Sequence, residues 1–168
     1  MANFKEYAKK LIEIEGGYVD HPNDAGGITM QGVTLTTFRQ YCGEDKTVAD
    51  LRNMSYGTWE DIMKDLYWDK CLADDIVNQS VAEILVDWCV NSGFVGLRRV
   101  QEIVGVKPDG IAGPKTLGAI NNADQHELFD RIMSARKQFY INIVKRSPNQ
   151  KVFMNGWMNR LLRFSFDA

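Results

Sequence analysis

The sequence predicts a mainly α-helical fold of the α+β type, with seven to eight helices and one small β-hairpin near residues 19–34. Apolar residues recur at helical spacing through most of the chain, and glycine, proline or capping residues bound these segments. Residues 19–34 are instead rich in glycine and small polar residues, with β-prone pairs between them. With 168 residues, 45% of them hydrophobic, the chain is long enough for one compact domain with a substantial core.

In the first half of the chain, one helix is predicted before the hairpin and several after it. The first helix covers residues 3–15, and Gly16-Gly17 is expected to stop it in the left-handed conformation. The other helices of this half are predicted at residues 36–42, at residues 48–53, from Ser55 or Thr58 onwards, and at residues 73–91. The last of these is the best candidate for a buried central helix, because apolar residues such as Leu85 and Trp88 recur along it.

The second half is predicted to be helical throughout, apart from its turns. A Pro-Asp-Gly turn at residues 108–110 interrupts it, and Pro114 is well placed at the first position of a helix. Asp124 and Glu127 have the spacing of a capping box at the start of a long helix. The predicted helices cover residues 94–104, residues 114–120, residues 124–145 and a last segment after Pro148.

Composition argues against several classes of protein. The chain has no run of about 18 apolar residues and begins with a charged, amphipathic pattern, so we expect synthesis in the cytoplasm without a signal peptide and no stable membrane insertion. Three cysteines without a C-x-x-C pair predict buried or inert thiols, and the two histidines predict no metal site. The sequence contains neither a Walker loop nor a G-x-G-x-x-G motif, so we expect no cofactor and no nucleic acid partner.

Charge is distributed unevenly along the chain. Residues 44–87 carry eleven acidic and four basic side chains, whereas residues 131–168 carry eight basic side chains and one acidic. The pattern predicts either a basic end that meets an anionic partner or two separate, solvated helix faces.

Glu15 is the candidate for chemistry that the physical pattern singles out. It follows Leu11 by four residues and Phe4 by eleven, so it projects from the apolar side of the first helix. A carboxyl group there must be paired, or must keep its proton near neutral pH because burial disfavours the anion. Asp24, on the glycine-rich loop, would stay ionised, and two such unlike carboxyl groups suit the cleavage of a glycosidic bond. The structural alternative makes Glu15 a helix cap and Asp24 a turn residue.

Two motifs resemble those of a known family. The first runs Glu15-Gly16-Gly17-Tyr18 and continues as Asp24-x-Gly26-Gly27-x-Thr29-x-x-Gly32-Val33-Thr34. The second runs Asp87-Trp88-Cys89-Val90-Asn91-Ser92-Gly93 and, further on, Asp109-Gly110-x-x-Gly113-Pro114-x-Thr116. Together they resemble glycoside hydrolase family 108, the peptidoglycan-cleaving N-acetylmuramidases of bacteria and their phages. The resemblance implies a lysozyme-like α+β fold with a catalytic lobe at residues 1–90 and a predicted peptidoglycan-binding, helical lobe at residues 91–168, packed as one compact unit.

The resemblance also implies roles for individual residues. It places the catalytic general acid on Glu15 and makes Asp24 and Thr29 candidates for positioning water or stabilising the charged transition state. The spacing of these three residues more loosely resembles that of phage-type lysozymes. Two departures from the family pattern, at Met30-Gln31 and Cys89-Val90, do not touch Glu15.

Several further residues are candidates for contacting the substrate. The aromatic rings could stack on sugars, and of two adjacent helical residues such as Tyr67 and Trp68 one can be exposed while the other packs in the core. Asn91 could hold an acetamido group, or it could simply satisfy the end of its helix. For Trp88 and Trp157 we expect packing in the core. The complete set of predicted substrate contacts is Tyr18, Gly27, Thr34, Tyr67, Trp68 and Asn91.

The function expected from this resemblance is hydrolysis of the β-1,4 bond between N-acetylmuramic acid and N-acetylglucosamine by a monomer acting on glycan strands. One alternative keeps the substrate but gives an anhydromuramic product, as in a lytic transglycosylase. Another is a wall-binding or secretion-assisting protein without catalysis. Any of these would act at the cell wall or in the periplasm after release or dedicated export. The stereochemical outcome depends on the separation of two carboxyl groups, which the sequence alone does not give.

Overall fold

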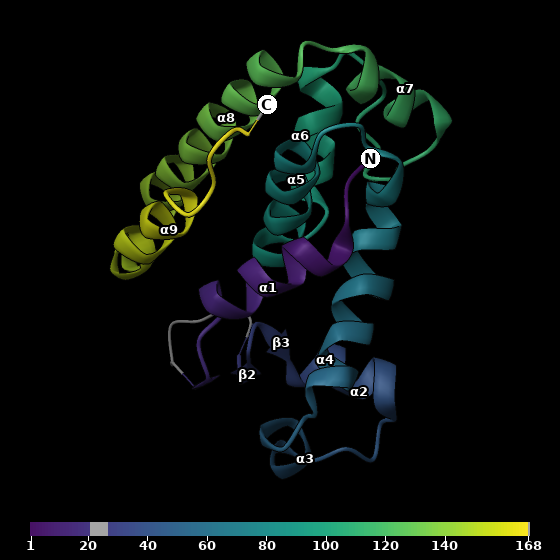
Figure 1. The fold of residues 1–168 in the computed structure, drawn as a ribbon. Coiled ribbons are helices and arrows are strands. Elements are labelled where there is room, and N and C mark those ends of the chain that lie inside the picture. The colour runs from purple at the N-terminus through teal and green to yellow at the C-terminus, as the bar shows by residue number, and fades with distance from the viewer. Residues whose placement is uncertain (21–26, 168) are drawn as a thin grey trace.

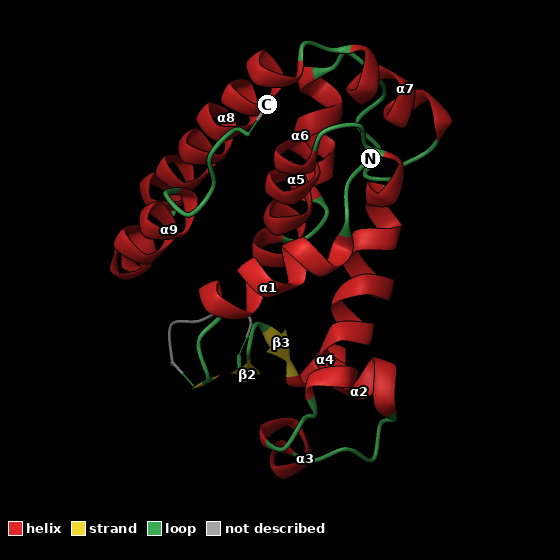
Figure 2. Ribbon diagram, viewed as in Figure 1, coloured by secondary structure: helices red, strands yellow, loops and turns green. Residues whose placement is uncertain are grey.

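The computed structural model describes residues 1–20 and 27–167, and helices dominate it (Figure 2). Within these residues the chain forms nine α-helices, several short 3₁₀ or π turns and a three-stranded antiparallel sheet. Helix α1 (Phe4–Ile14) lies between the sheet and the helices of the second half of the chain (Figure 1). The predicted fold class, mainly α with one small β element, is confirmed.

Helix α1 begins and ends as its capping chemistry requires. The side chain of Asn3 accepts a hydrogen bond from the backbone N–H of Lys5, and Phe4, Tyr7, Ala8 and Leu11 form the buried face. At the other end, Glu15 turns to an extended conformation, φ −74° and ψ 125°, while its N–H still bonds to the carbonyl of Leu11 at 2.8 Å. The predicted left-handed stop at Gly16-Gly17 is therefore wrong, because neither glycine has a positive φ and the chain leaves the helix at Glu15 itself.

The small sheet contains the predicted hairpin and one more strand. Strands β2 (Thr29–Met30) and β3 (Val33–Thr34) pair around a two-residue turn, and β1 (Tyr18–Val19) adds to the other edge of β2. Both turn residues have positive φ, 50° at Gln31 and 80° at Gly32. This is the combination that a type I′ hairpin turn demands, because its twist matches that of the strands.

Three short helices follow the sheet. Each is capped by a hydroxyl side chain that accepts a hydrogen bond from a backbone N–H in the first turn; the capping residues are Thr34, Thr47 and Ser55 respectively. The third continues into one turn of π-helix, Lys64–Trp68. The helices are α2 (Leu35–Cys42), α3 (Val48–Arg52) and α4 (Tyr56–Met63).

Helix α5 (Gln79–Ser92) is the predicted central helix, and residues 80–89 are all buried. It begins later than expected, since residues Ala73–Asp75 form a separate 3₁₀ turn and the extended backbone at Ile76 and Asn78 separates that turn from the helix. Asn78 then caps α5 by accepting from the N–H of Val81 at 3.1 Å. The predicted start at residue 73 is therefore wrong by six residues.

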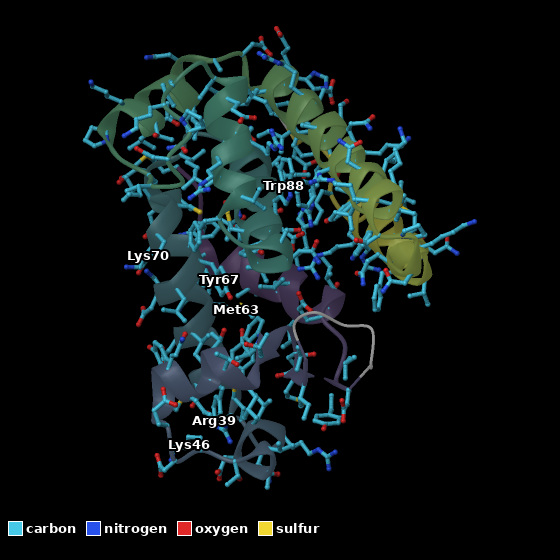
Figure 3. The ribbon with its side chains drawn as sticks, turned by 180° about the vertical axis from the view of Figure 1, so that it is seen from behind. Arg39, Lys46, Met63, Tyr67, Lys70 and Trp88 are labelled. Atoms are coloured by element: carbon cyan, nitrogen blue, oxygen red, sulfur yellow. The ribbon has the colours of Figure 1, made fainter. Side chains whose placement is uncertain are left out.

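The second half of the chain packs on α5. It contains α6 (Val95–Ile103), α7 (Pro114–Asn122), α8 (Gln125–Arg146) and α9 (Met154–Leu161). Trp88 of α5 meets Phe139 of α8 edge to face, with ring centroids 5.7 Å apart (Figure 3). Both halves contribute to one hydrophobic core. Among the residues that the structure describes, no helix combines the length and apolar character needed to cross a bilayer.

The three cysteines differ in their surroundings. Cys71 and Cys89 are buried with their sulfur atoms 3.8 Å apart, whereas Cys42 at the end of α2 is only half-buried. The hydrogen bond to Cys89, together with burial, raises the pKa of the Cys71 thiol well above its ordinary value. Because the thiolate is the reactive form, Cys71 should react slowly.

A thiol-labelling experiment should separate these environments. With a maleimide at neutral pH, we expect Cys42 to be modified first and Cys71 and Cys89 only at the rate of unfolding. Mass spectrometry of tryptic peptides would follow each site. In a Cys42→Ser variant the fast phase should disappear, and equal rates at all three sites in the native protein would contradict the burial described above.

Candidate active site

A cleft of about 450 Å³ lies between the small sheet and the C-terminal helices. The first half of the chain contributes Glu15 and residues of the sheet, and the end of α5 contributes Asn91. The opposite side is formed by α8, the following 3₁₀ turn Pro148–Phe153, and α9. Residues far apart in the sequence therefore meet around one cavity large enough for a sugar unit.

The carboxyl group of Glu15 lies between the guanidinium of Arg160 and the backbone of Gly32. Its Oε1 lies 2.6 Å from Nη2 of Arg160, and its side chain is 12% exposed. On another side the backbone of Gly32 packs against it so closely that a Cβ at Gly32 would lie 2.6 Å from the Glu15 Cδ. The sequence predicted that this carboxyl group is either paired or kept protonated by burial. In the structure it is paired, with Arg160.

Arg160 is itself held by a buried carboxylate, Asp87. The guanidinium of Arg160 donates through Nε to Oδ2 at 2.9 Å and through Nη2 to Oδ1 at 2.8 Å. Arg136 adds a third bond, from Nη2 to Oδ2 at 2.7 Å, and the Asp87 and Arg136 side chains are both fully buried. Burial alone would raise the pKa of Asp87, but Arg160 and Arg136 outweigh it and hold that pKa below its usual value. Asp87 is thus a buried anion that forms ion pairs with two arginines.

A line of hydrogen bonds runs from Arg136 to the cleft. Arg136 donates through Nε to the hydroxyl of Tyr140 at 2.8 Å, and that hydroxyl in turn donates to Oδ1 of Asn91. Ser92 also donates to the same Oδ1, at 3.2 Å. Since both bonds engage the carbonyl oxygen of the amide, the Nδ2 amino group of Asn91 is the donor that remains for a ligand in the cleft.

The other polar residues predicted for the site lie on the sheet. Thr29 and Thr34 both line the cleft, but Thr34 also caps α2 by accepting from the N–H of Thr37 at 3.0 Å. Gly27 is exposed, with φ 69°, and among the described residues no heavy atom lies within 4 Å of the position of a Cβ. Asp24 lies outside the described residues.

All three predicted stacking rings have protein partners, and Tyr18 and Tyr67 are the two that stay partly exposed. The face of Tyr18 is covered by the guanidinium of Arg52, 3.9 Å from the ring centroid. Tyr67 is half-buried and stacks on Phe94 with centroids 6.3 Å apart (Figure 3). Burial raises the pKa of Tyr67, and the charge of Glu15 is among the smaller causes acting in the same direction, so this ring lies near the acid.

The prediction for Trp68 is corrected. Its side chain is fully buried, with its ring 5.6 Å from those of both Phe4 and Tyr7. Its Nε1 donates to Asp74 at 2.7 Å. The adjacent Tyr67 takes the outer position, so Trp68 packs in the core and has no surface to offer a sugar.

Sequence reasoning missed the residues that hold Glu15 and Asn91, namely Asp87, Arg136, Tyr140 and Arg160. One signal was available. Arg136 lies four residues after Ile132 and four before Tyr140, both buried, so a charged residue occupies the apolar stripe of its helix. A buried arginine demands an anionic partner, although the pattern does not say which.

A carboxyl group in a cleft of sugar size, beside hydroxyl and amide groups, supplies one of the two carboxyl groups that a glycoside hydrolase ordinarily uses. The comparisons with known proteins agree with this class. The family model described as glycosyl hydrolase 108 matches residues 8–93, and the model described as predicted peptidoglycan domain matches residues 95–162. The chain belongs to the glycosyl hydrolase 108 family, it is a hydrolase that acts on peptidoglycan, and its place of action is the cell wall.

A solved structure supports the same assignment. The structure of Brucella abortus SagA is similar over 95% of this chain and 90% of its own, with a TM-score of 0.84 and 30% sequence identity. The comparison with curated proteins gave no match.

The close approach of Gly32 to Glu15 predicts a sharp effect of one methyl group. In Gly32→Ala the new Cβ would displace the flexible Glu15 side chain while the fold persists, and a displacement of about 1 Å can cost on the order of 100-fold in rate. Clearing of purified cell walls would measure the loss. Gly105→Ala is the matched control, because Gly105 has a similar φ of 75° but open space at its Cβ. Equal activity in the two variants would contradict the proposed contact.

The buried ion cluster predicts a pH-dependent contribution to stability. Since the pKa of Asp87 is lower in the folded protein than in the unfolded chain, its contribution is complete above the unfolded value of about 3.9 and is lost as the pH falls through the folded value. At pH 7 we expect Asp87→Asn to lose about 3–5 kcal/mol of unfolding free energy, because the buried Arg136 loses its anion and Arg160 keeps only Glu15.

Urea titrations of the wild type and the variant at pH 7 and below pH 4 would test this. The difference between the two proteins should narrow in acid. Asp130→Asn, at a side chain that is 68% exposed, should match the wild type at both values. A difference that stays constant or grows in acid would be inconsistent with an anionic Asp87 in the folded state.

Proposed function

We propose that the protein is an N-acetylmuramidase, which hydrolyses the β-1,4 bond between N-acetylmuramic acid and N-acetylglucosamine with Glu15 as general acid. The observation that carries the proposal is the position of Glu15, the only carboxyl group among the described residues that line the cleft. The match to the family model over residues 8–93 supports it. In this proposal residues 1–90 supply the acid, and residues 91–168 supply Arg160 and the opposite side of the cleft.

The reaction needs a proton on the glycosidic oxygen as the bond breaks. Glu15 gives this proton to the leaving oxygen while positive charge develops on the sugar ring. Arg160 can tolerate the change, since its two bonds to Asp87 keep it paired whether Glu15 is protonated or ionised. The rigid backbone of Gly32 and the anchored guanidinium together fix where the carboxyl group points.

Asn91 and Thr29 are proposed to position the substrate. The Nδ2 amino group of Asn91 can donate to the carbonyl of an acetamido group, and the bond from Tyr140 fixes its orientation. Thr29 lines the same cleft and can hold a water or a sugar hydroxyl. Asp24 stays the proposed second carboxyl group, on the strength of the motif alone.

Removal of the acid tests the function. We expect Glu15→Gln to clear purified cell walls about 100- to 10,000-fold more slowly than the wild type, the usual contribution of a general acid. Glu13→Gln is the matched control on the same helix, because the Glu13 side chain is 69% exposed. Turbidity would give the rates, and an undiminished rate in Glu15→Gln would refute the assignment.

The products decide between the two cleavage reactions. Hydrolysis adds one water and leaves a reducing muramic acid, whereas attack by the muramic 6-hydroxyl gives an anhydro product that lacks this water. We expect the hydrolytic mass in fragments released by the wild type. Binding to walls without released reducing ends would instead favour a non-catalytic role.

A further inference from the structure

The four tryptophans divide into three that are fully buried and one that is not. Trp59, Trp68 and Trp88 have no exposed surface, whereas Trp157 of α9 is half-buried and lines the cleft. Trp157 packs against the core, as expected, but it also leaves part of its ring in the cleft. A large ring kept partly open to solvent, three residues from Arg160 on the same helix, lies where a ligand of the Glu15 cleft would pass.

Trp157 belongs to an aromatic surface that the protein holds in place. It stacks on Tyr140 with centroids 5.0 Å apart and planes at 17°, and Phe153 packs beside it at 6.0 Å. Tyr140 is fixed in turn by its bonds to Arg136 and Asn91. We call the cleft-lining set Phe139, Ile143, Phe153 and Trp157 the apolar wall. Its members come from α8, the 3₁₀ turn and α9, and they share the cleft with Glu15.

The Asp-Gly run of the second half has a different role. Gln101 is fully buried, and its Nε2 donates to Asp109, to the carbonyl of Ile111 and to Thr116, at 3.0–3.1 Å. Its Oε1 accepts from the N–H of Gly110 at 2.8 Å. Asp109 and Thr116 are thus used to fold the turn around Gln101. Polar groups that already hydrogen-bond to a buried side chain are poor candidates for recognising a ligand.

We propose that the second half of the chain binds peptidoglycan through the apolar wall, with an N-acetylhexosamine ring of the glycan strand stacked on the open part of Trp157. This inference rests on the proposed function, because it assumes that the cleft takes a glycan strand. A sugar ring has an apolar face that suits an aromatic platform, while its acetamido and hydroxyl groups meet Asn91 and the polar side of the cleft. The binding surface of the second half is then one side of the active site.

The fluorescence of Trp157 provides a direct test. The protein is full-length Glu15→Gln, which binds without turnover, and the probe is soluble, peptide-free glycan strands of alternating N-acetylglucosamine and N-acetylmuramic acid. We expect saturable changes in tryptophan emission and protection from acrylamide quenching. Adding Trp157→Phe should keep binding, measured by co-sedimentation with insoluble peptidoglycan, but abolish the emission change. Adding Trp157→Ala should weaken binding by about tenfold or more, since it removes the stacking platform.

The controls separate the apolar wall from the Asp-Gly turn. Ile111→Ala alters a side chain of that turn that is 71% exposed, and Tyr56→Ala removes a ring on α4 that is 50% exposed. Both should bind like the parent. Weaker binding in Ile111→Ala with unchanged binding in Trp157→Ala would overturn the proposal, as would binding of strands without any change in emission. Wall clearing by the wild type is scored separately, so failure of the proposed function is distinguishable from failure of the apolar wall.

Discussion

The structure depends on one buried carboxylate, Asp87, and on the two arginines that neutralise it. An unpaired charge at this depth would cost several kcal/mol, so helices α5, α8 and α9 are constrained to meet where Asp87, Arg136 and Arg160 can bond. Helix α1 is drawn into the same cluster through Glu15. Each arginine also contacts a second group: Arg160 pairs with Glu15, and Arg136 donates a hydrogen bond to Tyr140. Both of these groups line the cleft. The same ion pairs therefore stabilise the fold and hold the side chains of the cleft in place.

This arrangement changes how the two halves of the chain are understood. The family models divide the chain near residue 94, but residues from both sides of this boundary line the cleft. The first half contributes the acid and a small sheet, and the second contributes the cation and an aromatic surface. Neither half alone supplies the lining of the Glu15 cleft. The uneven charge along the sequence is partly explained in the same way, since Asp87 of the acidic stretch pairs inside the molecule with Arg136 and Arg160 of the basic stretch, and Glu15 balances the second arginine.

Local pattern was sufficient for most of the fold and for placing Glu15 on the apolar side at the end of its helix, and insufficient for the groups that surround its carboxyl group. Periodicity and caps predicted the helices, and the glycine-rich stretch predicted the hairpin. The start of α5 was missed because the backbone becomes extended at Ile76 and Asn78 without a glycine or proline to mark the break. Trp68 and Tyr67 are adjacent on one helix, so only the packing of Phe4 and Tyr7 decides which ring is buried. Arg160 was missed because its role depends on tertiary contacts with Asp87 and Glu15, which have no fixed spacing.

The placement of Arg160 on α9 has a consequence for the order of events during synthesis. A ribosome makes Glu15 and the sheet early and α9 much later, so a growing chain carries the acid long before it carries the guanidinium that orients it. Until α9 docks, Asp87 also lacks one of its cations, and the cleft lacks Trp157 and its neighbours. If Glu15 acts as proposed, a nascent or prematurely terminated chain lacks an oriented acid and a complete cleft. Because Glu15 and Arg160 are far apart in the sequence, their ion pair can form only after α9 has been synthesised and has docked.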